Sequence, residues 1–411
     1  MSGGSGILGG MRVIEGSAFV AAPLGGMTLA QLGADVIRFD QIGGGLDYRR
    51  WPVSETGKSL FWAGMNKGKR SIQLDLRSAE GRELVAALVS GPGDDAGMFL
   101  TNFPAKGWLD YEVLRQRRAD LIMVALTGNY DGSSEVDYTV HPATGFPLVT
   151  GPSGSVEPVN SVLPAWDIAL GSLAATGLLA AERHRLRTGA GQLVSASLSD
   201  VAFAMVANLG RVAQASLGQN SDTVEKDGNF LYGAFGAPFS TADNRHVMVV
   251  GLTPRQWVAL GKATGLEQHY LRIEEDAGVD LSTESGRYHA RKHIAEYLET
   301  WFAQRTFESA SAALSDSGVA WGPYQTFDQL LDDPRMSAPN SLFDLIEQPG
   351  IGSYPMPASP LDFAESGRIQ VQRAPALGEH TDEILSEILG LNETEIGRLH
   401  DAHVVAGAGS A

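Results

Sequence analysis

Short apolar runs alternate with helical patterns along the first third of the chain, and this alternation restricts the fold more than any other feature. The run Met11–Glu15 precedes Pro23–Leu32, in which apolar residues recur at helical spacing before Gly33. Extended apolar sequence resumes at Asp35–Phe39. Strand, helix and strand in this order predict a βαβ unit, whose two strands are parallel.

The alternation continues, with further predicted strands and a helix at Ser71–Leu76, Ala79–Val89, Met98–Phe103 and Leu121–Leu126. Strands that are apolar along their whole length are typical of a parallel sheet with helices on both faces. The expected fold class is therefore α/β.

Two long helical patterns follow, and then a polar segment. We expect helices over Ile168–Arg185 and Val201–Leu217, the first ending at the turn that contains Gly189 and Gly191. Sequence rich in Gly, Asp and Asn at 219–229 predicts a linker. The first part of a large domain is thus expected at 1–218.

Beyond the linker, the patterns predict a smaller α+β domain at 219–330, with elements at His246–Leu252, Pro254–Thr264, Ala290–Phe302 and Phe307–Ser315. Gly- and Pro-rich sequence at Gln348–Pro360 predicts a long connection, and Glu379–Leu399 predicts two short helices. We expect 331–411 to return to the large domain.

Composition excludes several classes of protein. With 31 basic and 48 acidic residues the net charge is −17, so we expect no broad basic surface for nucleic acid or anionic lipid. The chain has no cysteine, which excludes disulfides, thiolate zinc sites and cysteine nucleophiles. The N-terminal segment lacks the features of a secretory signal, and the longest apolar run, Ile168–Ala181, is too short to cross a membrane. We expect a cytoplasmic protein.

Positive charge is concentrated between Val36 and Arg70. This segment has seven basic and three acidic residues, a local net charge of +4 on an acidic chain. It provides either a site for an anionic ligand or an ordinary solvated face.

Sequence motifs typical of other chemistries are absent, incomplete or in the wrong place relative to the predicted strands and helices. The glycines at 4–9 fit a dinucleotide fingerprint but precede the first strand, whereas that fingerprint must follow one. Neither Gly57–Ser59 nor Gly68–Arg70 has the upstream glycine of a P-loop, and no G-x-S-x-G elbow is present. His289 and His293 are four residues apart on a predicted helix without the zincin glutamate, so we expect a solvated face and no metal.

Five blocks in order resemble the family III CoA-transferases. They are Gly33–Asp40, Asn66–Leu84, Thr101–Gly107, Pro164–Val194 and Leu377–Leu391. The similarity spans nearly the whole chain. It implies a Rossmann-like large domain with a parallel sheet, a small domain, and a homodimer whose ring-like subunits interlock.

Segments 15–40, 43–53, 230–236 and 349–357 are most similar to one subgroup of that family. Its members move CoA from one carboxyl group to the other of a branched, unsaturated C5 dicarboxylate, a step of the 3-hydroxypropionate cycle of carbon fixation. The implied partner is the CoA thioester of that diacid. CoA is then part of the substrate, and no separate cofactor is expected.

The resemblance implies that Asp167 is the catalytic aspartate. From the residues alone, Asp167 directly precedes an apolar helix and would be its N-cap. The two interpretations are compatible, because a helix N-terminus favours the carboxylate form that a nucleophile needs. Leu170 stands three residues on, so no capping box accompanies it.

Family position also implies the residues that contact CoA, whose phosphates require positive charge: Arg38, Lys69, Arg70 and Asn102. From the residues alone, Arg38 is equally compatible with a surface ion pair to Asp40 or Asp35.

Two further roles are hypotheses from the chemistry. Arg49 or Arg50 would bind the free carboxylate of the diacid with two hydrogen bonds and so keep the acid from leaving between half-reactions. The backbone N–H groups of Gly233 and Gly236 are candidate donors to the tetrahedral oxyanion, with an ordinary turn role as the alternative.

The sequence departs from two other branches of the family. Val20 stands where formyl-CoA transferases have a glutamine, and their glycine-run loop has no counterpart, so formyl-CoA and oxalate are not expected substrates. Val136 stands where the racemases place a histidine, directly before the aspartate that corresponds to Asp137. The nearby His141 is expected to be a satisfied polar residue on a loop.

Three alternatives to transfer within one diacid remain open. They are a CoA-transferase that uses a separate acceptor acid, an α-methylacyl-CoA racemase, and a CoA-binding protein without activity.

Overall fold

The computed structural model describes residues 6–218, 226–337 and 340–409. The chain forms a large unit, 1–144, 161–219 and 334–411, and a small unit, 145–160 and 220–333. Segment 145–160, which we placed in the large domain from the sequence, therefore belongs to the small unit. Part of the glycine-rich N-terminal motif (4–5) and most of the predicted linker (219–225) lie outside the described residues.

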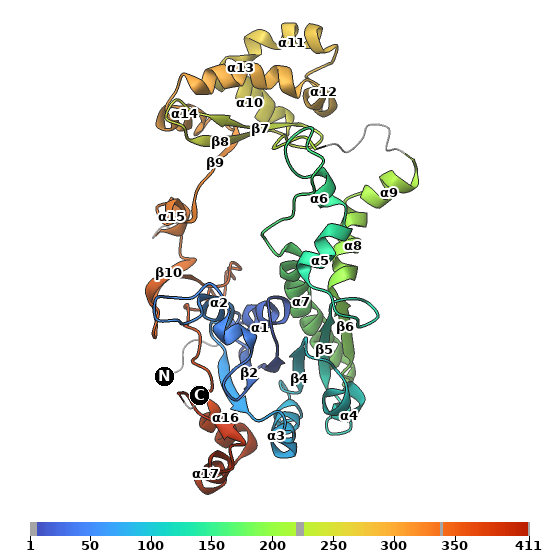
Figure 1. Ribbon diagram of the computed structural model, residues 1–411, viewed down its shortest axis with the longest axis vertical. Helices are drawn as coiled ribbons and strands as arrows, with labels where there is room; N and C mark the ends of the chain where they lie inside the picture. The colour runs from blue at the N-terminus through green and yellow to red at the C-terminus, as the bar shows by residue number, and fades with distance from the viewer. Residues whose placement is uncertain (1–5, 219–225, 338–339, 410–411) are drawn as a thin grey trace. The chain divides into compact units, whose positions relative to one another are not determined.

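The large unit is built on a seven-stranded sheet (Figure 1). All neighbouring strands are parallel except β12, which is antiparallel to β3. In sheet order the strands are β12 (Val405–Ala406), β3 (Arg70–Leu74), β2 (Asp35–Gln41), β1 (Arg12–Gly16), β4 (Met98–Thr101), β5 (Ile122–Thr127) and β6 (Leu193–Ser197). The predicted α/β class is confirmed. The strands β6 and β12 were not predicted, because β6 is only partly buried and β12 has two residues.

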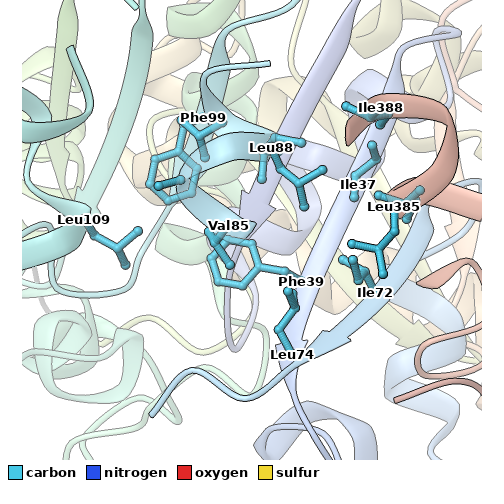
Figure 2. Close-up of a cluster of buried hydrophobic side chains, with 14 of the residues drawn as sticks. Ile37, Phe39, Ile72, Leu74, Val85, Leu88, Phe99, Leu109, Leu385 and Ile388 are labelled. Atoms are coloured by element: carbon cyan, nitrogen blue, oxygen red, sulfur yellow. The ribbon is translucent and has the colours of Figure 1, made fainter. Parts of the chain in front are cut away.

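Helices cover both faces of this sheet. On one face, α1 (Ala21–Ala30) and α7 (Ala165–Thr188) pack on each other, and α1 lies against Val36 and Leu100. On the other face, α3 (Ala79–Val89), α16 (Thr381–Leu389) and α17 (Glu393–Asp401) enclose the main apolar core. Figure 2 shows Leu385 and Ile388 of α16 beside Ile37 and Ile72 of the central strands. The C-terminal helices thus complete the core that the N-terminal strands begin.

Shorter elements complete the large unit: η1 (Leu46–Arg49), α2 (Leu60–Met65), η2 (Gly107–Leu109), α4 (Tyr111–Arg115), α5 (Asp137–Ala143), α8 (Leu198–Asn208), α9 (Arg211–Ser216), η4 (Pro334–Met336), β10 (Phe343–Gln348) and β11 (Gly352–Pro357). The single helix predicted over Val201–Leu217 is wrong: Gly210, with φ of 81°, separates α8 from α9. The predicted connection Gln348–Pro360 instead contains β11, which forms an antiparallel hairpin with β10.

The small unit has its own antiparallel sheet, in the order β7 (Phe235–Ser240), β8 (His246–Gly251) and β9 (Ala320–Pro323). Its helices are α6 (Phe146–Val149), α10 (Pro254–Thr264), η3 (Leu266–His269), α11 (Tyr270–Ala277), α12 (Glu284–His289), α13 (Arg291–Ala303), α14 (Phe307–Leu314) and α15 (Phe327–Leu330). His289 ends α12 and His293 lies in α13, so the two histidines do not share one helix as predicted.

In the described ranges, no helix combines the length and the apolar content that crossing a membrane requires.

Candidate active site

The topology places two helix N-termini at one edge of the sheet. The strand order reverses between β1 and β4, which are neighbours although distant in the chain. Since α1 follows β1 and α7 precedes β6, both helices begin at the carboxyl edge of the parallel strands. Ligands of open α/β sheets bind at this edge, beside such a reversal.

Asp167 lies in the first turn of α7, as its third residue. The helix begins at Ala165 rather than at Ile168, and its N-cap position is Pro164, whose side chain makes no capping hydrogen bond. The prediction that Asp167 is itself the N-cap is therefore wrong. The Asp167 side chain therefore does not serve as the N-cap of α7.

A second aspartate caps the helix instead. Oδ2 of Asp137, the first residue of α5, accepts hydrogen bonds from the backbone N–H groups of Trp166 (2.8 Å) and Asp167 (3.0 Å). Asp137 is buried. One turn further along α5, Nδ1 of His141 accepts from the indole N–H of Trp166 at 3.1 Å. The first turn of α7 is thus held by α5 at two points, and His141 is satisfied, as predicted, although it lies on a helix rather than a loop.

The Asp167 carboxyl group lies in an environment that makes it more basic than usual. Burial is the largest cause, followed by the negative charge of Asp137, and Arg50 partly opposes both; together they raise the pKa of Asp167 to about 6. The sequence-based expectation considered only the helix N-terminus, which acts in the other direction. At neutral pH most molecules still hold the carboxylate, and a more basic carboxylate is a better nucleophile.

Two glycines let α1 and α7 approach each other closely beside this site. A Cβ atom on Gly171 would lie 2.7 Å from the carbonyl oxygen of Ala21, and one on Gly25 would lie 3.1 Å from the carbonyl oxygen of Gly171. Gly171 is one turn beyond Asp167. The helix contact therefore sets the distance between Asp167 and the start of α1.

The loop after β1 is fixed by side chains from two other segments. Asn102 holds Ala18 with two hydrogen bonds: its Oδ1 accepts from the Ala18 N–H at 2.9 Å, and its Nδ2 donates to the Ala18 carbonyl at 2.7 Å. Oδ1 of Asp47 accepts from the N–H of Phe19 at 3.0 Å. These bonds maintain Phe19 in the left-handed region, with φ of 64°, which is strained for a residue with a side chain.

Arg50 is held between two aromatic rings next to this loop. Its guanidinium carbon lies 5.3 Å from the ring centre of Phe19 and 5.0 Å from that of Phe61 on α2. Ser59 donates to the Arg50 carbonyl at 2.6 Å and so fixes its backbone. Of the two arginines proposed for the diacid, Arg50 is the one whose charge acts on Asp167, whereas Arg49 is exposed at the end of η1.

The model of one protein family, CoA-transferase family III, matches residues 8–381. The chain belongs to CoA-transferase family III. It is 57% identical to 2-methylfumaryl-CoA isomerase of Chloroflexus aurantiacus over 98% of each chain. It is also 30% identical to succinyl-CoA:mesaconate CoA-transferase of Haloarcula hispanica, covering 93% of this chain and 96% of that one.

Among solved structures of the family, a CAIB/BAIF family protein from Brucella suis matches with a TM-score of 0.75 and 27% identity, over 93% of this chain and 100% of that one. The Rossmann-like architecture expected from the resemblance is thus shared with a solved family structure. The interlocked dimer stays a prediction.

In this family III chain, Arg38 is a buried structural ion. It is 1% exposed, packs over Trp62 and donates from Nε and Nη2 to both carboxylate oxygens of Asp40 at 2.9 and 3.1 Å. Nη2 also donates to Asp47 at 3.3 Å, and Nη1 donates to Asn66 at 3.2 Å. The expected ion pair with Asp40 exists, but in the interior, and the CoA contact of Arg38 stays a prediction.

Lys69 and Arg70 are also engaged by the protein itself. Nζ of the buried Lys69 donates to Glu15 at 2.8 Å, and burial lowers the pKa of Lys69 to about 8 although Glu15 acts against it. Arg70 pairs with Asp35, Glu383 and Glu387 at 2.6 to 2.9 Å. Much of the local positive charge is thus neutralised within the fold. The predicted CoA contacts of these residues and of Asn102 stay predictions, and the hydrogen bonds described above give each residue a structural role.

Gly233 and Gly236 lie in the small unit. Gly233 occupies a turn with φ of 79°, and Gly236 lies in β7, where its carbonyl accepts from the Leu231 N–H at 2.8 Å. A Cβ atom on Gly236 would meet Leu231 at 2.9 Å. The positive φ of Gly233 and the close approach of Leu231 to Gly236 account for glycine at these two positions. Their role as oxyanion donors stays a prediction.

Sequence reasoning missed three contributors to the site: Asp137, Phe19 and Phe61. In the sequence, Asp137 is notable only for its place next to Val136. Its 30-residue separation from Asp167 hid the contact, since only the tertiary structure brings α5 to the start of α7.

Proposed function

We propose that this chain interconverts 2-methylfumaryl-CoA and 3-methylfumaryl-CoA by moving CoA between the two carboxyl groups of one bound diacid. The observation that supports it most is the combination of Asp167, a free carboxylate in a helix first turn, with Arg50 close enough to act on its charge. The 57% identity to 2-methylfumaryl-CoA isomerase supports the choice of substrate.

The first half-reaction places CoA on the enzyme. One Asp167 carboxylate oxygen attacks the thioester carbonyl, the C–S bond breaks, and a mixed anhydride and CoA thiolate result. The thiolate then attacks the Asp167 carbonyl carbon of the anhydride. The C–O bond to the substrate acyl group breaks, which leaves an aspartyl-CoA thioester and the free dicarboxylate.

The second half-reaction repeats these steps with the other end of the diacid. Its second carboxylate attacks the aspartyl thioester, thiolate leaves, and a new anhydride forms. The thiolate then attacks the substrate carbonyl and releases the Asp167 carboxylate. One thioester is exchanged for another, so the reaction requires neither ATP nor a separate cofactor.

Arg50 explains how the acid is retained between the half-reactions. A guanidinium can bind a carboxylate with two parallel hydrogen bonds, and the Phe19 and Phe61 rings restrict Arg50 to few orientations. In this proposal Arg50 binds whichever carboxylate is not reacting. Retention separates an isomerase from a transferase that exchanges acids with solution.

The other candidates have less support. A transferase that uses a separate acceptor would employ the same Asp167, and family relatives such as succinyl-CoA:mesaconate CoA-transferase bear such names. A racemase needs a proton-transfer pair; here Val136 replaces the histidine, and Nδ1 of His141 is occupied by Trp166. The homodimer and the cytoplasmic location are part of this proposal as expectations from the sequence.

Labelled free methylfumarate tests the proposal. During turnover of wild-type enzyme, we expect no label in either CoA ester. Arg50→Lys should lower kcat about tenfold and allow label to enter the CoA esters, because a lysine cannot form the two parallel hydrogen bonds that an arginine makes with a carboxylate. The matched control Arg49→Lys should behave as wild type. Label entering the wild-type product at the rate of turnover would instead establish transfer between separate acids.

A further inference from the structure

Asp137 is a buried carboxylate that contacts the backbone of the proposed nucleophile. Oδ2 of Asp137 accepts from the peptide N–H groups of Trp166 and Asp167, the second and third residues of α7. Backbone N–H groups in the first turn of a helix point away from the carbonyl groups of their own helix, and Pro164 at the N-cap of α7 makes no side-chain capping hydrogen bond. The capping oxygen therefore has to come from another element.

We propose that Asp137 is the positioning residue of Asp167: it fixes the peptide from which the nucleophilic side chain projects and sets the direction of that side chain toward the thioester. This inference rests on the proposed role of Asp167. A hydrogen bond to the peptide of the reacting residue is a direct constraint, because a misplacement of about 1 Å can lower a rate by about 100-fold.

Asp137 acts through charge as well as through geometry. Two groups influence the Asp167 carboxyl group by their charge: Asp137 on α5, which is negative, and Arg50 after η1, which is positive. His141, also on α5, accepts a hydrogen bond from the indole N–H of Trp166. Removing the charge of Asp137 while keeping an acceptor oxygen should therefore leave the helix capped but make Asp167 more acidic.

Two substitutions separate these contributions. Asp137→Asn retains an oxygen that can accept both N–H groups, so we expect kcat within about threefold of wild type. The acid limb of its kcat/KM profile should move down by about half a pH unit or more, because a like charge is gone. Asp137→Ala loses the cap, and kcat should fall about 10- to 100-fold with little change in KM.

A matched control is available on another helix. Asp110 caps α4 by accepting from the Glu112 N–H at 2.8 Å, in the same unit but outside the site. Asp110→Asn and Asp110→Ala should lower thermal stability at most, with kcat and the pH profile unchanged. If the changes in kcat came only from the loss of a helix cap, they would appear in the Asp110 variants as well as in the Asp137 variants.

The experiment measures kcat, KM and the pH profile of all four variants, with hydroxylamine trapping of wild-type enzyme mixed with 2-methylfumaryl-CoA. If wild type forms no adduct at Asp167, the proposed function fails. If it forms the adduct but Asp137→Asn has an unshifted acid limb, or a folded Asp137→Ala retains wild-type kcat, the positioning role is refuted. Should Asp137→Ala not fold, the shifted limb of Asp137→Asn still decides the question.

Discussion

The peptide N–H of Asp167 donates to Oδ2 of Asp137 at 3.0 Å, so one carboxylate caps the helix turn that presents another. The two negative groups are close enough for Asp137 to raise the pKa of Asp167, and Arg50 on the other side limits that rise. The arrangement gives a carboxylate that is more basic than a surface aspartate yet ionised at neutral pH.

The first prediction concerns pH. In the proposed mechanism only the ionised form of Asp167 attacks the thioester, and the pKa of Asp167 is about 6. We expect kcat/KM to fall below this pH with one acid limb near 6, since that ratio reports the free enzyme. A profile that stays flat from pH 7 to pH 4.5 would contradict this environment for Asp167.

The second prediction concerns stability. A carboxyl group with a raised folded-state pKa imposes no penalty below its unfolded value of 3.8, and the penalty develops as pH rises through about 6. Asp167→Asn removes it and should stabilise the fold by about 1–2 kcal/mol at pH 8, allowing for partial solvent screening. Denaturant unfolding at pH 8 and pH 4 measures this, and the gain should vanish at pH 4. An equal gain at both pH values would assign the effect to something other than ionisation.

A substitution at Arg38 distinguishes a structural role of this residue from a phosphate-binding role. Arg38→Met leaves the buried carboxylates of Asp40 and Asp47 without their partner and should destabilise the protein by about 3–5 kcal/mol. Arg117→Met, which breaks an exposed pair with Glu83, is the control and should cost less than about 1 kcal/mol. If Arg38→Met were as stable as the control but raised KM for the CoA ester tenfold, a phosphate contact would be the better account.

The spacing of α1 and α7 is tested at Gly171. A methyl group there would lie 2.7 Å from the Ala21 carbonyl, so Gly171→Ala should destabilise by about 1–3 kcal/mol and lower kcat by moving Asp167. At Gly397 on α17 a methyl group meets nothing within 4 Å, and Gly397→Ala should be neutral or stabilising by up to about 1 kcal/mol. Thermal unfolding and steady-state kinetics of both variants measure the difference. Unchanged kcat in Gly171→Ala would show that the close contact between α1 and α7 does not affect catalysis.

Local periodicity predicted most of the large sheet, because its central strands are apolar throughout and its helices have regular spacing. It failed where a strand depends on its partner: β12 has two residues, and β11 is defined by pairing with β10. The break between α8 and α9 depends on one residue, Gly210, with positive φ.

The site was predictable only in part for the same reason. Asp167 and Arg50 were among the residues named from the sequence. The burial of Arg38 was not foreseen, because its partners Glu15, Asp40 and Asp47 come from three segments that meet only in the folded protein.

Covalent trapping at Asp167 tests the central claim most directly. Enzyme mixed with 2-methylfumaryl-CoA, quenched with hydroxylamine and digested, is analysed by mass spectrometry. The account predicts a hydroxamate on the peptide that contains Asp167, absent without substrate and absent in Asp167→Asn, which should also lose isomerase activity. An unmodified Asp167 in turning-over enzyme, or an Asp167→Asn variant that interconverts the two esters at the wild-type rate, would contradict it.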